Sequence, residues 1–542
     1  MFRLRNWLTA ITVTMLAPEL GSADWTFKSR PDLSPPTLNI TLSTPSEISP
    51  GYIFVSPRPS RRVKPIGPFG PVQAGPYIFT TTGELVWSGI GSFSAATNNF
   101  QAARLNGQDV LFGFEFDATS RRTQFGQGRV RILDRKYEMV KEVAMMNHII
   151  ADKHEFQIRN EKTALFVSYT PVQCDLTEFS TSPKAQWLLD GVFQEVDIET
   201  GRLVFEWRSL DHVSPSECVV PLSTLSLGSG LNNTDAIDFF HINSVDGDGK
   251  NYLISARRTS TIYKVNGTTG DIIWRLGGKY SNFTFGPGAS FGLQHDARFV
   301  YSSEGADTAT ISLFDNSGQR SCDGEWENES SGKKLVLDTQ NWTANLVQKF
   351  AAPNGEFAFA MGNTQVLPNG NVFVNWGTAG AITEFSPSGT TVFHAYLDSG
   401  VLFRNGRPAS YRGFRFNWTG MPSEDPAIVS LANRESMTVY VSWNGDTKTK
   451  SWQFWGIDPE GREELLGEEE RMGFETEFHV ESGSGWKGFL AKALGKDGKV
   501  LRMSKVAKVR PYISPYDSEK DGLAVEKNSP QALVHEGRKS EL

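Results

Sequence analysis

The chain has 542 residues, of which 39% are hydrophobic and 21% are charged, and its formal net charge is −7. This composition is typical of soluble globular proteins and excludes a polytopic membrane protein. The sequence contains no basic stripe that would neutralise a run of phosphates, which argues against nucleic acid as a partner. The 51 glycines, 27 prolines and 12% aromatic residues indicate many short strands joined by tight turns. We therefore expect an all-β fold.

Residues 1–23 have the pattern of a secretory signal peptide. Arg3 and Arg5 precede an apolar stretch at 7–17, and small residues at 21–23 offer a cleavage site before Asp24. The stretch is short for a membrane span, so we expect no stable span after its removal, with an N-terminal anchor as the alternative. The expected compartment is the secretory pathway, with a secreted or lumenal product. Seven N-x-S/T sequons predict a glycoprotein: Asn39, Asn232, Asn266, Asn282, Asn328, Asn341 and Asn417.

The cysteine content limits the use of disulfides in this fold. Cys174, Cys218 and Cys322 allow at most one intramolecular bridge, and their pairing stays open. No CxxC, HxxxH or similar spacing of metal ligands accompanies them. We therefore expect no metal and no organic cofactor.

A Gly-centred turn followed by a strand with an aromatic residue recurs along the chain, at residues 82–87, 200–207, 269–274 and 388–393. Two of the three intervals are much longer than the third, and degenerate copies of the unit lie inside them at 133–140 and 337–347. Such units are typical of propeller blades. They predict a six-bladed β-propeller, with a pair of β-sandwiches as the alternative fold. Trp87, Trp207 and Trp274 are expected to occupy equivalent packing positions.

The chain divides into four predicted segments. The signal peptide at 1–23 precedes the propeller at 24–424, and a small C-terminal β module covers 425–512. The aromatic residues that alternate in the C-terminal module are expected to form its core. Residues 513–542 are polar without an apolar period and are predicted to be disordered.

Two polar residues precede a predicted hairpin in the middle of the chain. His241 and Asn243 stand two residues apart, so a regular strand would place both on one face. The turn at 246–249 and the strand that follows it bring Arg257 or Arg258 back beside His241. Guanidinium groups suit sulfate, phosphate or carboxylate, which makes this hairpin a candidate anion site.

Two further histidines fall in other predicted blades. His295 lies between Gln294 and Asp296, and His154 lies in Asp152-Lys-His-Glu-Phe156. Each histidine alone is more often structural, but inner strands of successive blades converge on one axis. We therefore expect a shared site at one end of the channel. The remaining histidines, at 148, 212, 394, 479 and 535, are interpreted as structural or surface residues.

Several ordered motifs resemble the fungal-type branch of the arylsulfotransferase family. They are D-x-x-HINSV from Asp238, LIS-x-R, TG-x-IIWRLGG, QHDARF, HEF at 154–156 and the run 362–371. The similarity extends from about residue 50 to residue 510. It implies a six-bladed propeller that moves a sulfuryl group from an aryl sulfate to a phenol without a nucleotide donor. Arg258 and Leu293 depart from the residues expected in close relatives, namely a histidine and an aromatic residue.

The resemblance also implies roles for the candidate residues. His295 would be the nucleophile that forms a sulfohistidine, with His241 and His154 as further catalytic residues. Asn243, Arg257 and Arg258 would bind the small aromatic or phenolic substrate through its sulfate. A neutral imidazole is a competent nucleophile near pH 7, and a protonated His154 would assist departure of the phenolate.

Three other functions stay open from the sequence. A secreted propeller can be a non-catalytic binding module. The same histidines could perform acid/base chemistry, such as a cyclisation or isomerisation in secondary metabolism. A histidine-rich channel mouth could also hold a divalent metal.

Overall fold

The computed structural model describes residues 24–59, 70–117, 125–179, 184–302, 307–317, 329–400, 407–432, 436–481 and 485–511. The predicted signal peptide and C-terminal tail lie outside these residues, as do Asn328, Cys322 and His535.

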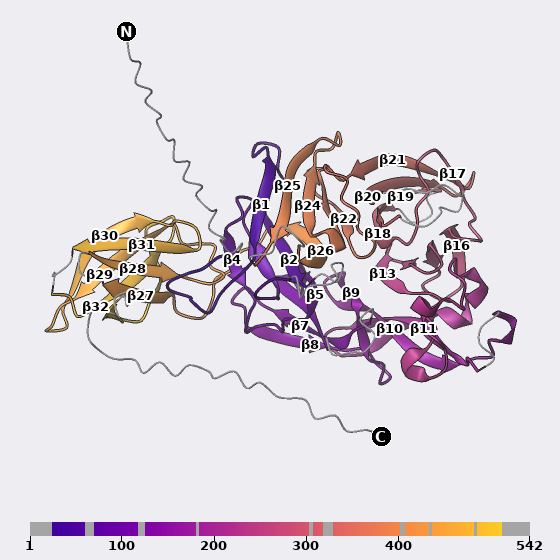
Figure 1. Cartoon of the computed structure of the whole chain (residues 1–542), viewed down its shortest axis with the longest axis horizontal. Coiled ribbons are helices and arrows are strands. Elements are labelled where there is room, and N and C mark those ends of the chain that lie inside the picture. Colours follow the sequence, from indigo (N-terminus) through magenta and orange to yellow (C-terminus); the bar gives the residue numbers. More distant parts are fainter. Residues whose placement is uncertain are drawn as a thin grey trace, which may run out of the picture.

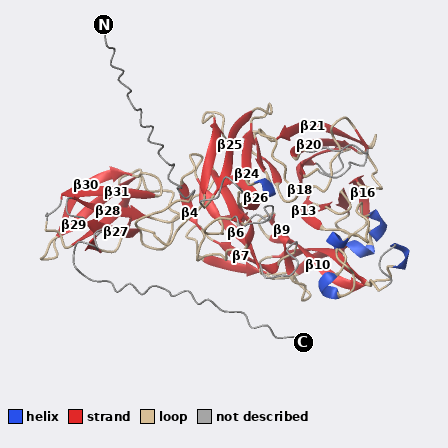
Figure 2. Cartoon of the chain, viewed as in Figure 1, coloured by secondary structure: helices blue, strands red, loops and turns tan. Residues whose placement is uncertain are grey.

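The described chain is all-β with almost no helix (Figure 2). Its helices are single 3₁₀ turns, namely η1 (Thr177–Phe179), η2 (Ser209–Asp211), η3 (Pro215–Glu217), η4 (Leu225–Leu227), η5 (Asn233–Asp235) and η6 (Gly377–Ala379). Within the described ranges, no helix has the length and apolar character needed to cross a bilayer.

Four sheets of four or five strands are arranged like propeller blades (Figure 1). The first contains β26 (Ala409–Phe416), β2 (Tyr52–Arg58), β3 (Tyr77–Phe79) and β4 (Leu85–Ser88). The second contains β13 (Ile242–Gly247), β14 (Tyr252–Ala256), β15 (Thr261–Val265) and β16 (Ile272–Gly277). The third contains β18 (His295–Ser302), β19 (Thr308–Asp315), β20 (Ser331–Asp338), β21 (Thr343–Ala351) and β17 (Thr284–Phe285). The fourth contains β22 (Asn363–Val366), β23 (Val372–Asn375), β24 (Ala381–Phe385), β25 (Thr391–Asp398) and β1 (Thr37–Ser43).

An eight-stranded sheet lies between the first and second of these sheets. It contains β5 (Thr97–Leu105), β6 (Gln108–Phe116), β7 (Gln127–Leu133), β8 (Met139–Val143), β9 (Ala151–Arg159), β10 (Thr163–Gln173), β11 (Trp187–Asp197) and β12 (Leu203–Arg208). β7 pairs with β6, β8 and β9, and its link to β9 is short, through Gln127 and Gly128. The propeller-like arrangement is therefore confirmed, whereas the number of six blades stays a prediction because β5–β12 form one hydrogen-bonded sheet.

The innermost strands of these sheets contact one another in a ring, in the order β26, β5, β9, β13, β18, β22 and back to β26. The ring is closed by strands from distant parts of the chain, because β26 pairs antiparallel with β2, with Tyr52 opposite Phe416. Such a closure ties the two ends of the repeat together and leaves only short edges exposed.

The C-terminal strands form a second, nearly closed sheet. It contains β30 (Glu463–Glu470), β29 (Ser451–Ile457), β32 (Gly488–Leu494), β34 (Ala507–Pro511), β27 (Ala427–Ala432), β28 (Ser436–Ser442) and β31 (Glu475–Glu481), with β33 (Val500–Met503) beside β32. The two edges meet where Gly467 of β30 packs under the ring of Phe478 of β31, which leaves no room for a side chain at Gly467. The aromatic residues predicted to be core are buried here, for example Trp452 and Phe454.

The nearly closed sheet β27–β34, called the barrel from here on, contacts the propeller in part through a small aromatic interface. Tyr137 stacks on Trp87 with ring centroids 4.9 Å apart, and its hydroxyl donates to the Gly445 carbonyl at 2.7 Å. The Gly445 N–H donates to the Val86 carbonyl at 2.8 Å. This interface lies at the outer strand of the first sheet, away from the central axis.

The recurring turns fall where the repeat pattern predicts them. Trp87, Trp207 and Trp274 lie on β4, β12 and β16, each of which is an end strand of its sheet, and all three are buried. The fourth copy places buried Phe393 on β25. The degenerate copies 133–140 and 337–347 form the β7–β8 and β20–β21 hairpins. The aromatic residues thus fill the layers between neighbouring sheets.

Candidate active site

Three of the candidate histidines lie together at the ring of innermost strands. His154 is on β9, His241 directly precedes β13, and His295 begins β18. The rings of His154 and His241 meet edge to face with centroids 4.9 Å apart. Tyr411 on β26 contacts the rings of His154 and His295, with centroid separations of 5.7 and 6.4 Å. All four side chains are buried, so strands from four sheets converge on one histidine cluster.

Each histidine of this cluster is anchored through Nδ1. His154 bonds to Asp152 Oδ1, and His241 Nδ1 lies 2.5 Å from Asp238 Oδ2. His295 Nδ1 lies 2.5 Å from Asn316 Oδ1. An oxygen partner at Nδ1 requires the proton there, which leaves Nε2 with its lone pair.

The orientation of Asn316 is itself fixed. Its Nδ2 donates to the carbonyls of Ala358 at 2.7 Å and Met361 at 2.9 Å, so its Oδ1 faces His295. The Met361 N–H points at His295 Nε2 from 3.4 Å, a long and weak contact. The contacts of Asn316 at Nδ1 and of Met361 at Nε2 therefore both favour the tautomer of His295 with a lone pair on Nε2.

Burial lowers the pKa of all three histidines. The pKa of His241 falls to about 4, although Asp238 opposes the shift. The pKa of His154 falls because of burial, against the effect of Asp152. Burial and the charge of Arg257 hold the pKa of His295 well below its ordinary value. Near pH 7 the cluster therefore contains neutral imidazoles.

Arg257 is the positive charge next to this cluster. Its Nη2 donates to the Phe359 carbonyl at 3.0 Å, while its Nε is buried without a hydrogen-bond partner. Burial and the neighbouring Arg258 lower its pKa to about 9, which leaves it charged at pH 7. Phe359 stands two residues before Met361, whose N–H points at His295 Nε2, so Arg257 is held near the nucleophile candidate. An anion would supply the acceptor that the Nε lacks.

Arg258 and Asn243 have different surroundings from Arg257. Arg258 Nε lies 3.4 Å from Asp238 Oδ2, the carboxylate that anchors His241. Burial alone would raise the pKa of Asp238, but His241 and Arg258 lower it to about 2. Asn243 Nδ2 donates to the Gln294 carbonyl at 2.7 Å, directly before His295. The contacts of these two residues thus support His241 and the backbone at His295.

The expected alternation of His241 and Asn243 along one strand face is wrong. His241 has a φ of 57° and precedes the strand, and the pairing of β13 with β14 shifts between Ile242 and Ser244. The hairpin itself is as expected, since the Arg257 N–H donates to the His241 carbonyl at 2.9 Å. Side chains do not alternate between the two faces here, because the bulge at Asn243 inserts an extra residue.

Irregular pairing occurs at every one of these site strands. The register shifts between Phe166 and Val167 opposite β9, between His295 and Arg298 in β18, and between Val55 and Pro57 opposite β26. In β26, Tyr411 and Arg412 together stand opposite the single residue Ser56 of β2. Bulges change the direction of side chains next to active sites. Here one residue contributes to the histidine cluster, and the residue after it forms ion pairs.

The residues that follow the site side chains form a buried ionic network. Arg412 Nη1 lies 2.9 Å from Glu155 Oε1, and its Nε lies 3.2 Å from Asp296 Oδ1. Arg298 Nη2 lies 2.6 Å from Glu155 Oε2 and 2.7 Å from Asp296 Oδ1. Glu155, Asp296 and Arg412 directly follow His154, His295 and Tyr411 in the chain. Asp296 pairs with Arg298 and Arg412 and thereby joins the inner strands.

Four further residues of the site carry no sequence motif that predicts their role, namely Tyr411, Asn316, Tyr169 and Phe125. Tyr169 donates its hydroxyl to the Ile242 carbonyl, and its ring and that of Phe125 contact both His154 and His241. None of the four stands in a motif with a histidine, since the fold brings them together from four different strands and loops. For Tyr411 the only signal was a polar Ser-Tyr-Arg run in the closing strand.

The other histidines and cysteines serve elsewhere. His212 stacks on Trp207, and His394 bonds to Thr383 Oγ1 at 2.7 Å, while His148 and His479 lie near the surface. Cys174 and Cys218 are free thiols. In the described ranges, no three His, Cys, Asp or Glu side chains are placed to hold a metal ion.

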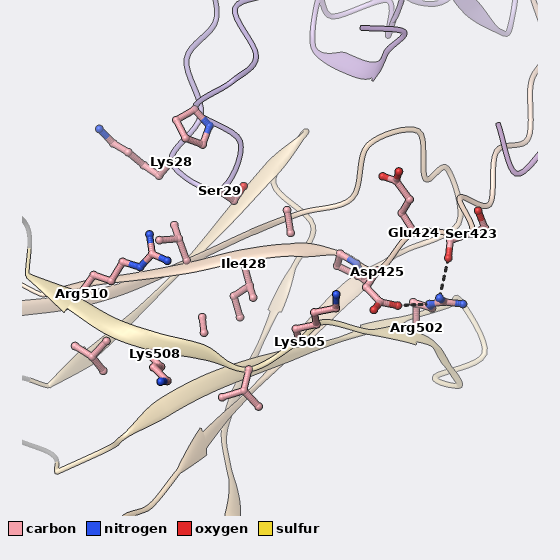
Figure 3. A pocket seen from close by; sticks show the side chains of 17 residues that line it. Lys28, Ser29, Ser423, Glu424, Asp425, Ile428, Arg502, Lys505, Lys508 and Arg510 are labelled. Atoms are coloured by element: carbon pink, nitrogen blue, oxygen red, sulfur yellow. Dashed lines mark hydrogen bonds and ion pairs between the residues drawn. The ribbon is translucent and has the colours of Figure 1, made fainter. Parts of the chain in front are cut away.

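A separate cavity of about 1050 Å³ lies at the barrel, and it shares no residue with the histidine cluster (Figure 3). It is lined by residues 28–31, 423–429 and 502–510, where Arg502 pairs with Asp425 at 2.8 Å.

The fold and the site define an all-β, propeller-like protein with a buried histidine–arginine centre. Residues 101–398, more than half of the chain, match the family model described as Arylsulfotransferase (ASST). The chain therefore belongs to the arylsulfotransferase family, a family of transferases. A search of curated proteins gave no match.

Solved structures show only distant likeness. Glutaminyl cyclase of Myxococcus xanthus is 12% identical, with 38% of this chain and 64% of that chain covered and a TM-score of 0.20. A GH43 protein of Bacillus licheniformis is 7% identical, with 76% and 88% covered and a TM-score of 0.27. The chain thus spans less than two thirds of the cyclase. TM-scores this low support no inference about the present chain.

Proposed function

We propose that this protein transfers a sulfuryl group from an aryl sulfate to a phenol through a sulfohistidine on His295. The observation that carries the proposal is the fixed tautomer of His295 beside Arg257. Asn316 holds Nδ1–H at 2.5 Å, so Nε2 keeps the lone pair that a nucleophile needs. Membership of the arylsulfotransferase family supports this type of reaction.

In the first half-reaction, Nε2 of His295 forms a bond to sulfur as the bond between sulfur and the aryl oxygen breaks. The departing phenolate takes the electron pair of that bond. Arg257 stabilises the sulfuryl oxygens, and its unpartnered Nε gains an acceptor. No proton has to move when the leaving phenolate is stable.

In the second half-reaction, an acceptor phenol gives its proton to Nε2 of His154 and attacks the sulfur. The bond between sulfur and His295 breaks, and its electron pair returns to Nε2. A neutral imidazole with a carboxylate at Nδ1 suits this base role, because Asp152 stabilises the imidazolium that forms. Because burial lowers the pKa of His154, we assign it this base role in place of the protonated role expected from the sequence.

The test is incubation of the purified protein with 4-nitrophenyl sulfate, followed by mass spectrometry of proteolytic peptides. We expect a sulfuryl mass increment on the peptide containing His295, and its loss when a phenol is added. The His295→Ala variant should give no increment, while His394→Asn, a buried histidine outside the cluster, should keep it. Wild-type protein that releases no nitrophenol and acquires no increment would exclude sulfuryl transfer.

A second candidate function is acid/base tailoring of a secondary metabolite. The pairs His154–Asp152 and His241–Asp238 favour it, because each supplies a neutral base anchored by a carboxylate. Product analysis with an aryl sulfate, a phenol and a chelator distinguishes the two functions and the metal alternative. Isomerised product without sulfate release would support this second function.

Four finer features belong to the same proposal. We infer six blades, with β5–β8 and β9–β12 as two units joined through β7 and β9. We also infer the predicted segment boundaries and passage through the secretory pathway. The exposed sequon residues, such as Asn232 and Asn282, support glycosylation.

A further inference from the structure

Tyr411 carries a buried polar atom without a partner. Its side chain is 3% exposed, yet no hydrogen bond to its hydroxyl exists in the structure. A buried hydroxyl without a partner is destabilising, so such groups point to a role beyond packing. Tyr169, the other tyrosine of the cluster, uses its hydroxyl fully by donating to the Ile242 carbonyl.

The ring of Tyr411 contacts two of the proposed reacting groups. This ring lies against His295, the proposed nucleophile, and against His154, the proposed base for the acceptor phenol. The bulge in β26 and the ion pair of Arg412 with Glu155 fix the backbone on either side. The hydroxyl is thus held in place by neighbours and bound by none of them.

We propose that Tyr411 is a catalytic residue whose hydroxyl donates a hydrogen bond to the aryl oxygen of the donor as the phenolate departs. The proposal rests on the proposed sulfuryl transfer and specifies the leaving-group side of that site. The ligand that it recognises is the phenolic oxygen of an aryl sulfate, not the sulfate alone.

The step balances without a further reactant. As His295 Nε2 bonds to sulfur, the aryl oxygen receives the electron pair of the breaking bond, and Tyr411 keeps its proton while donating the hydrogen bond. Burial raises the pKa of Tyr411, so the hydroxyl stays protonated and able to donate. In the second half-reaction the same hydroxyl binds the oxygen of the acceptor phenol, whose proton goes to His154.

The Tyr411→Phe variant tests the proposal, because it keeps the ring contacts and removes only the unpartnered oxygen. We expect the rate of nitrophenol release to fall about 10²- to 10³-fold, as for loss of one oxyanion donor. The loss should grow from 4-nitrophenyl sulfate to unsubstituted phenyl sulfate, because a poorer leaving group needs the hydrogen bond more. Thermal stability should stay the same or rise. Tyr169→Phe is the matched stability control, and it should lower the melting temperature because it leaves the Ile242 carbonyl unpaired.

Two measurements separate failure of this inference from failure of sulfuryl transfer. If wild-type protein releases no nitrophenol, the proposed function fails, and the inference fails with it. If wild-type protein transfers sulfate while Tyr411→Phe keeps its rate and leaving-group dependence, only the inference is overturned. Binding of the product 4-nitrophenolate gives an independent readout: Tyr411→Phe should bind it about tenfold more weakly or worse, and equal affinity would overturn the inference.

Discussion

The guanidinium of Arg412 lies 2.9 Å from the Glu155 carboxylate, and the two residues directly follow Tyr411 and His154. Each side chain of this ion pair is at most 1% exposed. One residue along each strand therefore reaches the reaction site, and the next joins β26 to β9. The ion pair joins the closing strand β26 to β9, and it thereby helps to fix the positions of Tyr411 and His154.

Replacing Arg412 with Met should destabilise the protein by about 3–5 kcal/mol, because it leaves the Glu155 and Asp296 carboxylates without a buried partner. Urea unfolding measures this loss. Arg415→Met is a matched control, since Arg415 pairs with Glu384 at 2.6 Å in an equally buried place away from the histidines. Both variants should lose stability, but only Arg412→Met should also lower the rate of aryl sulfate turnover in the folded protein. Equal turnover in the two variants would contradict the positioning role.

Asn316→Ala should lower kcat about tenfold or more with little change in KM. The hydrogen bond from His295 Nδ1 is lost, so the ring samples the tautomer without a lone pair on Nε2. Steady-state kinetics with 4-nitrophenyl sulfate measure the two constants. Asn363→Ala provides the control, because Asn363 exchanges two hydrogen bonds with Gly413 but contacts no histidine. A change in KM alone would argue that Asn316 acts on substrate binding.

The acid limb of the kcat/KM profile should lie below pH 6.5. The nucleophile must be neutral, and burial with the Arg257 charge holds the pKa of His295 well below its ordinary value. Activity should therefore persist as the pH falls through 6.5 and disappear only at lower pH. In Arg257→Gln the limb should move to higher pH, because one of the causes of the lowered pKa is gone. A wild-type limb near pH 6.5 or above would exclude a buried neutral His295 as the nucleophile.

Stability should fall on acidification from about pH 6.5 to pH 4. The pKa of His241 is about 4 in the fold, against an ordinary value of about 6.5 in an unfolded chain. Between these values the unfolded state binds the proton and the folded state does not, so the free energy of unfolding decreases as the pH drops. Above pH 6.5 this contribution is complete and constant. Urea unfolding at several pH values checks the slope, with His479→Gln on the barrel surface as a control that should leave it unchanged.

Trp274→Ala should cost about 3–5 kcal/mol of stability. The Trp274 side chain is 3% exposed and packs edge to face on Phe283 with centroids 5.4 Å apart. Trp342→Ala is the control, because Trp342 is 38% exposed and should cost much less. Thermal denaturation compares the two. Unchanged stability of Trp274→Ala combined with lost ligand binding would reverse the packing interpretation.

The sequence by itself determined the β-rich architecture, the recurring turns and the histidine motifs. Turn glycines and alternating apolar residues are local signals, so the positions of Trp87, Trp207 and Trp274 on end strands could be predicted from them. His154, His241 and His295 could be chosen because their neighbours form motifs. The same local pattern gave the hairpin that returns Arg257 to His241.

The tertiary structure decided which side chains share the site and in what state. Bulges break the period of two at Asn243, Asp296 and Tyr411, so no alternation rule gives the direction of these side chains. Tyr411 enters the site because ring closure brings distant strands together, whereas Asn316 enters because it directly follows β19, which pairs with β18 at His295. Burial makes the histidines neutral, which is a property of their shared surroundings and not of any one motif. Local sequence signals indicate where strands and turns lie. The contacts between sheets join residues far apart in the chain, and these contacts decide the protonation state and the partners of the site histidines.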